Sequence, residues 1–310
     1  MKESNKNTFN HLKIHTQYSI CEGAIKIDQL KDYCKTNKIK SLAISDTYNL
    51  SGALEFSENL SSIGTQPIIG TQILFKFKET FGLLPLIAKN IEGYKNIIEL
   101  SSKSYLENDN FSNPHCIFDD LLKKNDGIIV LSGSITNLIG KLFNAGLFDD
   151  IDFIYKKLSE KFVNNFYLEI QRHNEDGEKL FEKFLINQSE KIDLPIIATN
   201  EVYYLEKDMH EAHDAFLCVG EKTYVNVKDR RKYTADHYLK SAEEMHHLFK
   251  DLPDALENNL NFPLRISYRP KNSPPVLPDI QTSKTKNVDD SLIKDSRDGL
   301  KEKLKEYVFP

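Results

Sequence analysis

The sequence predicts an α/β fold, a barrel built around a largely parallel sheet. Short apolar runs alternate with amphipathic helical patterns along most of the 310 residues. The runs are almost continuously apolar, which is typical of strands covered on both faces. Polar residues follow each run directly, where a barrel of parallel strands places its functional site. These strand and helix units are numerous enough to close such a barrel.

The strands are predicted from these apolar runs, in chain order, at 9–15, 40–46, 67–75, 83–89, 127–132, 166–171 and 194–200. Between the first two, a helix is predicted with Ile27, Leu30 and Cys34 on one face, and another helix is predicted over 94–105. Ser241 and Glu244 have the spacing of a capping box and predict a helix start, and a further helix begins near Pro253.

The chain is predicted to divide near residue 270. Residues 1–270 carry the barrel pattern, whereas 271–310 begin with a Pro-rich stretch (273–279) and a polar stretch (281–290), as a linker does. A helical pattern resumes at Ser291 and includes Leu300 and Leu304. We interpret it as the first helix of a further domain.

Composition excludes several classes of protein. The net charge of -5 comes from interspersed acidic and basic residues, which does not favour direct DNA binding by this chain alone. The four cysteines are far apart, so we expect reduced thiols rather than disulfides or a zinc site. No apolar run is long enough for a membrane span, and a cytoplasmic location without membrane contact is expected.

The motif at 11–23 resembles a histidine-based metal site, but Lys13 occupies a position where a ligand is expected. An imidazole nitrogen can coordinate a divalent cation, whereas an ammonium group has no lone pair to donate. The motif therefore predicts a site whose metal chemistry is lost.

Six further motifs, at 42–52, 67–70, 167–171, 198–202, 212–214 and 238–245, follow in order. With the opening motif, they resemble the PHP (polymerase and histidinol phosphatase) domain at the N-terminus of bacterial replicative DNA polymerase III alpha subunits. The resemblance implies a distorted (β/α)7 barrel, followed by a linker and the first helix of a missing polymerase (palm) domain, which would hold magnesium. It implies three metals at the mouth of the barrel and phosphoester hydrolysis in active members.

The resemblance implies nine ligand positions, which here carry His11, Lys13, Glu22, Thr47, Gln72, Leu83, His173, Glu201 and Tyr203. His11, Glu22, His173 and Glu201 remain as plausible donors, too few for three ions. We therefore expect no metal or other cofactor in this chain, and no catalytic residue. Our hypothesis is that the Lys13 ammonium lies among Glu22 and Glu201 and offsets their charge.

The leading functional interpretation is a non-catalytic module that supports a DNA polymerase. By resemblance, it docks a separate proofreading exonuclease subunit and other replicase subunits, and meets DNA only through the full-length protein. The alternative is an active metal-dependent phosphoesterase, either a 3'-5' exonuclease or a pyrophosphatase. A free-standing enzyme resembling histidinol phosphatase is a third interpretation.

Several other residues have structural explanations. Asp46 is predicted to cap the backbone amides of Tyr48 or Asn49. His15 is assigned either a supporting role beside the site or a structural one, and His210 and His213 are expected to pack and hydrogen-bond. The basic run at 222–232 is expected to be a solvated loop rather than a DNA contact.

Overall fold

The computed structural model describes residues 8–108, 113–276 and 287–307. It divides into two compact units, Met1–Lys271 and Asn272–Pro310. The predicted Pro-rich linker lies partly outside the described residues. In the second unit, the predicted helix is present as α11 (Val288–Tyr307).

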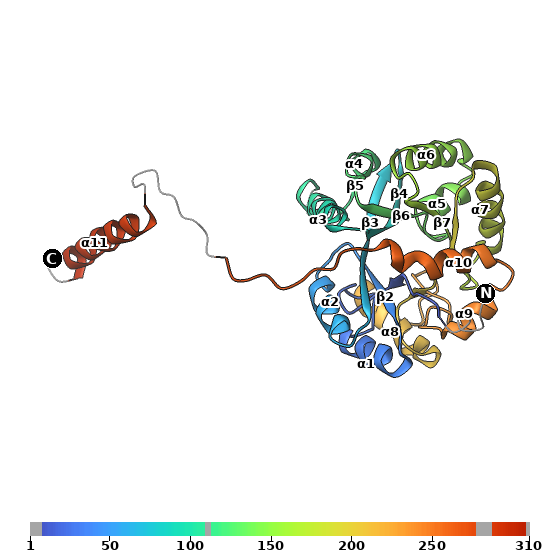
Figure 1. Cartoon of the computed structure of the whole chain (residues 1–310), viewed down its shortest axis with the longest axis horizontal. Helices are drawn as coiled ribbons and strands as arrows, with labels where there is room; N and C mark the ends of the chain where they lie inside the picture. Colours follow the sequence, from blue (N-terminus) through green and yellow to red (C-terminus); the bar gives the residue numbers. More distant parts are fainter. Residues whose placement is uncertain (1–7, 109–112, 277–286, 308–310) are drawn as a thin grey trace. The chain divides into compact units, whose positions relative to one another are not determined.

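The first unit is organised around one curled sheet (Figure 1). Its strands are β1 (Lys13–Ile14), β2 (Ser41–Thr47), β3 (Gln66–Phe77), β4 (Thr80–Ala88), β5 (Cys116–Ile117), β6 (Ile128–Leu131), β7 (Phe166–Ile170), β8 (Ile196–Ala198) and β9 (Glu201–Val202). They are ordered β8-β7-β6-β4-β3-β2-β1-β9, with β5 beside β3. Thr199 and Asn200 alone separate β8 from β9, so the two ends of the sheet meet and the barrel closes.

This arrangement is the predicted distorted (β/α)7 barrel. Among the described strands, β8 and β9 act as one strand broken at Thr199, and with β1, β2, β3, β4, β6 and β7 they make seven around the barrel. The expectation of a parallel sheet fails at β4, which is antiparallel to both β3 and β6. Only Lys78 and Glu79 join β3 to β4, and so short a connection can join only antiparallel strands.

Helices cover the outside of the barrel: α1 (Ile27–Asn37), α2 (Ala53–Ser61), α3 (Ile91–Leu106), α4 (Phe118–Lys123), α5 (Leu138–Asn144), α6 (Phe148–Lys161), α7 (Glu178–Ile192), α8 (His210–Glu221), α9 (Ala242–Leu248) and α10 (Pro253–Asn261). α1 buries Ile27, Leu30 and Cys34, as predicted. The Ser241 hydroxyl accepts the Glu244 N–H and the Glu244 carboxylate accepts the Ser241 N–H, which confirms the capping box of α9.

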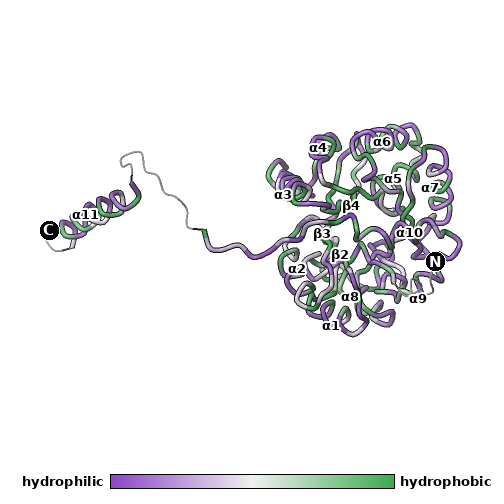
Figure 2. The backbone as a smooth tube through the Cα atoms, in the orientation of Figure 1, coloured by the Kyte–Doolittle hydropathy of each residue, from purple (hydrophilic) through white to green (hydrophobic). Residues whose placement is uncertain are grey.

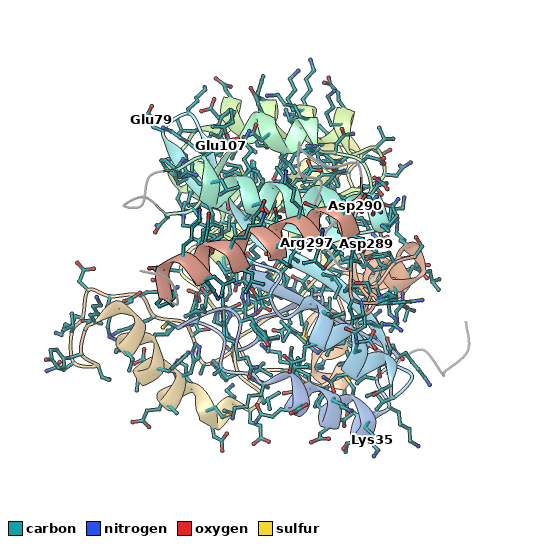
Figure 3. All side chains as sticks on the ribbon, turned by 90° about the vertical axis from the view of Figure 1, so that its left-hand side faces the viewer. Lys35, Glu79, Glu107, Asp289, Asp290 and Arg297 are labelled. Carbon is teal, nitrogen blue, oxygen red and sulfur yellow. The ribbon has the colours of Figure 1, made fainter. Side chains whose placement is uncertain are left out.

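The interior of the barrel is apolar at its amino end. One cluster of buried residues contains side chains from six strands, including Ala43, Ile68, Ile87, Ile129, Tyr167 and Ile197. Phe262, which follows α10, packs into the same cluster. These strands are successive neighbours in the sheet, and their inward side chains meet inside the barrel. Figure 2 shows that residues along much of β2 and β3 are hydrophobic. Charged side chains such as Lys35 and Glu79 extend outward (Figure 3).

Within residues 8–108, 113–276 and 287–307, no helix combines the length and the apolar character required to cross a membrane.

Candidate functional site

The inner face of the barrel changes from apolar to polar toward the carboxyl ends of its strands. Side chains two residues apart on a strand share a face, and Ala43 is followed in this way by Ser45 and Thr47. On β3, Ile68 is followed by Gly70 and Gln72, and on β7, Tyr167 is followed by Glu169 and Gln171. Three strands therefore bring polar side chains to the same end of the barrel, where the site was predicted.

Lys13 lies at the centre of this polar layer and is fully buried. Its Nζ is 3.2 Å from Glu201 Oε1 and 3.4 Å from Glu169 Oε1. β1 pairs with β9 so that Lys13 is opposite Glu201, while Glu169 comes from β7. The predicted offset of Glu201 by the ammonium is therefore confirmed.

Glu22 is not the other partner of Lys13, which corrects our hypothesis. The Glu22 carboxylate accepts hydrogen bonds from the hydroxyls of Thr47 (2.5 Å) and Tyr233 (2.9 Å) and from Arg231 (3.1 Å). It belongs to the loop after β1, which folds back so tightly that a Cβ on Gly23 would lie 2.1 Å from the Thr16 carbonyl oxygen. The loop thus holds Glu22 in a second cluster at the rim of the mouth.

Glu201 contacts two further side chains of the layer besides Lys13. Its Oε1 accepts the Gln72 amide N–H at 2.6 Å and lies 3.1 Å from His15 Nε2. Burial alone would raise the pKa of Glu201, but the Lys13 ammonium and the contacts with His15 and Gln72 outweigh it and hold the pKa well below its usual range. Glu201 is therefore ionised at neutral pH, and His15 takes the supporting role that was one of its two predicted alternatives.

The two remaining histidine donors already contact protein groups. His11 Nε2 lies 2.9 Å from the Lys240 carbonyl oxygen, and burial lowers the pKa of His11 to about 4. His173 Nε2 accepts the Glu201 backbone N–H at 3.2 Å and is 3.0 Å from Asn200 Oδ1. Burial, aided by the nearby His237 and Lys240, lowers the pKa of His173 well below its ordinary value. Both imidazoles are therefore neutral at pH 7.

Two of the nine positions supply hydrophobic or aromatic surface. Tyr203 is buried, and its ring stacks on His15 at 4.4 Å and on Tyr233 at 4.3 Å between centroids. Leu83 is opposite Leu74 on the β3–β4 hairpin, two residues before Pro85, which is opposite Gln72. The Gln72 amide nitrogen also lies 3.0 Å from His15 Nε2, and Gln72 Oε1 accepts from the amide nitrogen of Asn137 at 3.3 Å.

Asp46 corrects another prediction. Its carboxylate accepts the Thr16 backbone N–H at 2.6 Å and the hydroxyls of Thr16 (2.8 Å) and Ser19 (2.7 Å), while the Tyr48 N–H is bonded to the Gln72 carbonyl. Asp46 thus fastens the loop after β1 and does not cap Tyr48 or Asn49. His213 Nε2, 2.7 Å from the Glu22 carbonyl oxygen, supports the same loop from α8.

The basic run at 222–232 is a loop that is exposed at most positions, as predicted, but two of its arginines are paired with acidic side chains. Arg230 makes two hydrogen bonds to Asp214, of 2.6 and 2.5 Å, and Arg231 contacts Glu22 and Glu221 at 3.1 Å. These two arginines fasten the segment over the rim of the mouth.

Sequence reasoning missed Glu169, Tyr233 and Lys240. Glu169 lies in a quoted motif (167–171), and its position on the inner face, two residues after Tyr167, was a usable signal. Lys240 is buried, and its Nζ is 3.1 Å from Asn200 Oδ1; burial lowers the pKa of Lys240 to about 8. Lys240 also lies in a quoted motif (238–245), whereas nothing local in the sequence distinguishes Tyr233 from a surface residue.

The donors do not fit the three-metal cluster that the resemblance implies. An ammonium group lies between two of the carboxylates, and each of the four retained donors already contacts protein groups. Within the described ranges, no group of three His, Cys, Asp or Glu side chains is arranged to hold an ion. In this arrangement the Lys13 ammonium offsets the nearby carboxylates, but no coordination position is open for a metal ion.

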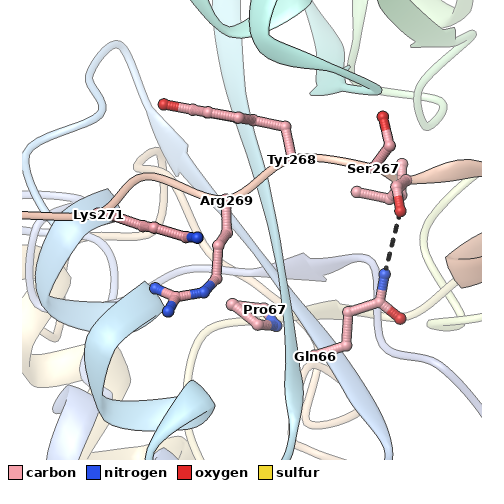
Figure 4. A pocket seen from close by; sticks show the side chains of 7 residues that line it. Gln66, Pro67, Ser267, Tyr268, Arg269 and Lys271 are labelled. Atoms are coloured by element: carbon pink, nitrogen blue, oxygen red, sulfur yellow. Dashed lines mark hydrogen bonds between the residues drawn. The ribbon is translucent and has the colours of Figure 1, made fainter.

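A pocket of about 540 Å³ lies at the opposite end of β3 (Figure 4). Gln66, the first residue of β3, lines it together with Tyr268, Arg269 and Lys271, and Arg269 pairs with Glu58 at 2.8 Å. The pocket is thus separated from the polar layer by the apolar interior of the barrel.

The comparisons with known proteins agree with this geometry. The PHP domain family matches residues 11–173, which is more than half of the chain. This chain belongs to the PHP domain family.

Among curated proteins, the chain is similar to DNA polymerase III subunit alpha of Caulobacter vibrioides, with 34% identity over 98% of this chain and 27% of the relative. The same subunit of Rickettsia bellii is 34% identical over 96% of this chain and 25% of its own length. The chain thus spans about a quarter of the length of these relatives.

Among solved structures, a two-domain protein from Bacteroides vulgatus, described as containing a predicted PHP-like metal-dependent phosphoesterase, aligns with a TM-score of 0.40 at 11% identity. The alignment covers 64% of this chain and 52% of that one. A likeness at this level says nothing about activity.

Proposed function

We propose that this chain is the PHP domain of a bacterial DNA polymerase III alpha subunit, in which it serves as a non-catalytic structural module and docks the separate proofreading exonuclease subunit. The polymerase activity, with its magnesium, and the contact with DNA would reside in the remainder of the full-length protein. A cytoplasmic location is part of the proposal. The similarity to alpha subunits over nearly the whole chain supports the assignment of this chain to such a subunit.

The observation that carries the non-catalytic assignment is the position of Lys13. Phosphoester hydrolysis in metal-dependent enzymes requires ions that activate a water molecule and bind the phosphoryl oxygens. Here an ammonium group lies between Glu169 and Glu201, and Glu22 is engaged by Thr47, Tyr233 and Arg231. The mouth therefore lacks the open ligands on which that chemistry depends.

An exposed apolar patch beside the mouth is our candidate for the docking surface. It consists of Ile20 (82% exposed), Val219 (73%), Tyr224 (78%) and Val225 (52%). Gly220 packs so closely on Cys21 that a Cβ there would lie 2.4 Å from the Cys21 Cβ, which joins the loop of Ile20 to α8. Exposed apolar patches of this kind are typical of protein interfaces.

Two measurements test the proposal. Hydrolysis of single-stranded DNA and of p-nitrophenyl phosphate should stay at the buffer rate with Mg²⁺, Mn²⁺ or Zn²⁺; metal-dependent turnover would instead establish the alternative phosphoesterase. Calorimetric titration with the exonuclease subunit of the same organism should show binding that is lost in V219S/Y224S. The matched control is Leu180→Ser, an equally exposed apolar residue on α7 (69%). Absence of binding by the unaltered chain would contradict the docking role.

A further inference from the structure

α11 (Val288–Tyr307) has an exposed apolar face. Because an α-helix has 3.6 residues per turn, the apolar side chains of α11 lie within one arc of about 160°. They are Val288, Leu292, Ile293, Leu300, Leu304 and Tyr307. Each of them is exposed, from 38% for Leu304 to 75% for Tyr307. Helices in proteins are stabilised mainly by the packing of such a face, so α11 requires a partner surface.

Two opposite charges lie on this apolar face. Asp289 is near its N-terminal end and Lys303 near its C-terminal end, with Ser296 midway between them. The two charged groups are about 21 Å apart along the helix, too far to pair with one another. The other charged side chains of α11 lie at the edges of the arc or on the opposite side of the helix. Because an unpaired buried charge is costly, a surface that covers the face must offer a cation to Asp289 and an anion to Lys303.

A second copy of α11 offers both partners. When two copies lie antiparallel with their Ser296 residues facing one another, Asp289 of each copy faces Lys303 of the other. A parallel pair would instead place Asp289 against Asp289 and Lys303 against Lys303, and like charges in contact are destabilising. We propose that two copies of this chain associate through α11 as an antiparallel helix pair centred on Ser296. This association is separate from the docking role proposed above.

The residues beside this central row fit the same register. On one side, Ile293 of each copy lies beside Leu300 of the other; on the opposite side, Leu292 lies beside Gly299. Within the described part of the chain, a Cβ at Gly299 would meet no atom within 4 Å, so no contact there requires a glycine. Glycine inside a helix costs about 1 kcal/mol relative to alanine. The close approach of Leu292 from a second helix accounts for it.

The test measures the mass of the whole 310-residue chain by sedimentation equilibrium at concentrations from about 5 to about 200 µM. We expect an equilibrium between monomer and dimer. Asp289→Lys and Lys303→Asp each place like charges in contact, and each should weaken the dimer by at least about tenfold. An equimolar mixture of these two variants should associate again, and so should D289K/K303D, because both restore pairs of opposite charge.

Asp290→Lys is the matched control. It makes the same change of charge at the same end of the helix but outside the apolar face, so it should leave association unchanged. The proposal is overturned if the unaltered chain stays monomeric over this range, which would mean that a different surface covers the face. It is also overturned if Asp289→Lys and Lys303→Asp associate like the unaltered chain, or if neither their mixture nor D289K/K303D restores the dimer.

Discussion

The two layers inside the barrel differ in what stabilises them, although they lie on the same strands. In the apolar layer, Ile68, Ile129 and Ile197 stabilise the fold through burial alone, and each contact is largely independent of the others. In the polar layer, Lys13, Glu169 and Glu201 are favourable only as a set, because each would be an uncompensated buried charge without its partners. Two residues further along the same strand, the interior therefore changes from packing contacts that add independently to charges that stabilise the fold only together.

The largest expected effect is the loss of one member of the charged set. Glu201→Ala removes a partner of Lys13, His15 and Gln72 at once. We expect the free energy of unfolding to fall by about 4 kcal/mol, measured by urea denaturation at pH 7. Glu201→Gln, which keeps the shape, is the control for packing. A loss below about 1 kcal/mol would show that the layer is not interdependent.

Next in size is a cavity in the apolar layer. Ile68→Ala should cost about 3 kcal/mol, because the surrounding barrel cannot collapse into the space. The loss should be the same at pH 7 and pH 5, because the members of this cluster other than Tyr167 are apolar and carry no titratable group. A loss that varied with pH would mean that the two layers are coupled.

Acid should weaken the polar layer through its neutral histidines. The pKa of His11 is about 4 in the folded protein and 6.5 in the unfolded chain, so the unfolded state binds more protons as the pH falls through 6.5. Stability should therefore decline from pH 7 to pH 5 by about 2 kcal/mol from His11 alone, with His173 acting in the same direction. Glu201, with its lowered pKa, keeps its contribution until the pH falls below about 4.5. His11→Asn should flatten the decline between pH 7 and 5, and an unchanged slope would contradict this assignment.

The smallest effect is expected at the rim. Arg231 contacts Glu22 and Glu221, but its side chain is 39% exposed, and water screens such pairs. Arg231→Ala should change the free energy of unfolding by less than about 1 kcal/mol. Hydrogen exchange of the 222–232 segment should nevertheless become faster, because this contact fastens the loop. A change as large as that of Glu201→Ala would place Arg231 within the interdependent set.

The sequence by itself determined where the strands occur along the chain and the PHP family, and it predicted the loss of metal ligands. Those properties are readable because apolar runs, motif spacing and the chemistry of single residues such as Lys13 are local. It also indicated that Lys13 would offset Glu201, since both occupy positions of one ligand set.

Only the tertiary structure decided which partners the charged residues take. Glu169 rather than Glu22 is the other partner of Lys13, Asp46 fastens the loop at Thr16 and Ser19, and Arg231 and Tyr233 close on Glu22. β4 runs against its neighbours because a two-residue connection joins it to β3. These contacts join residues far apart in the chain, and their geometry depends on how the strands register and how the barrel closes, which no local pattern specifies.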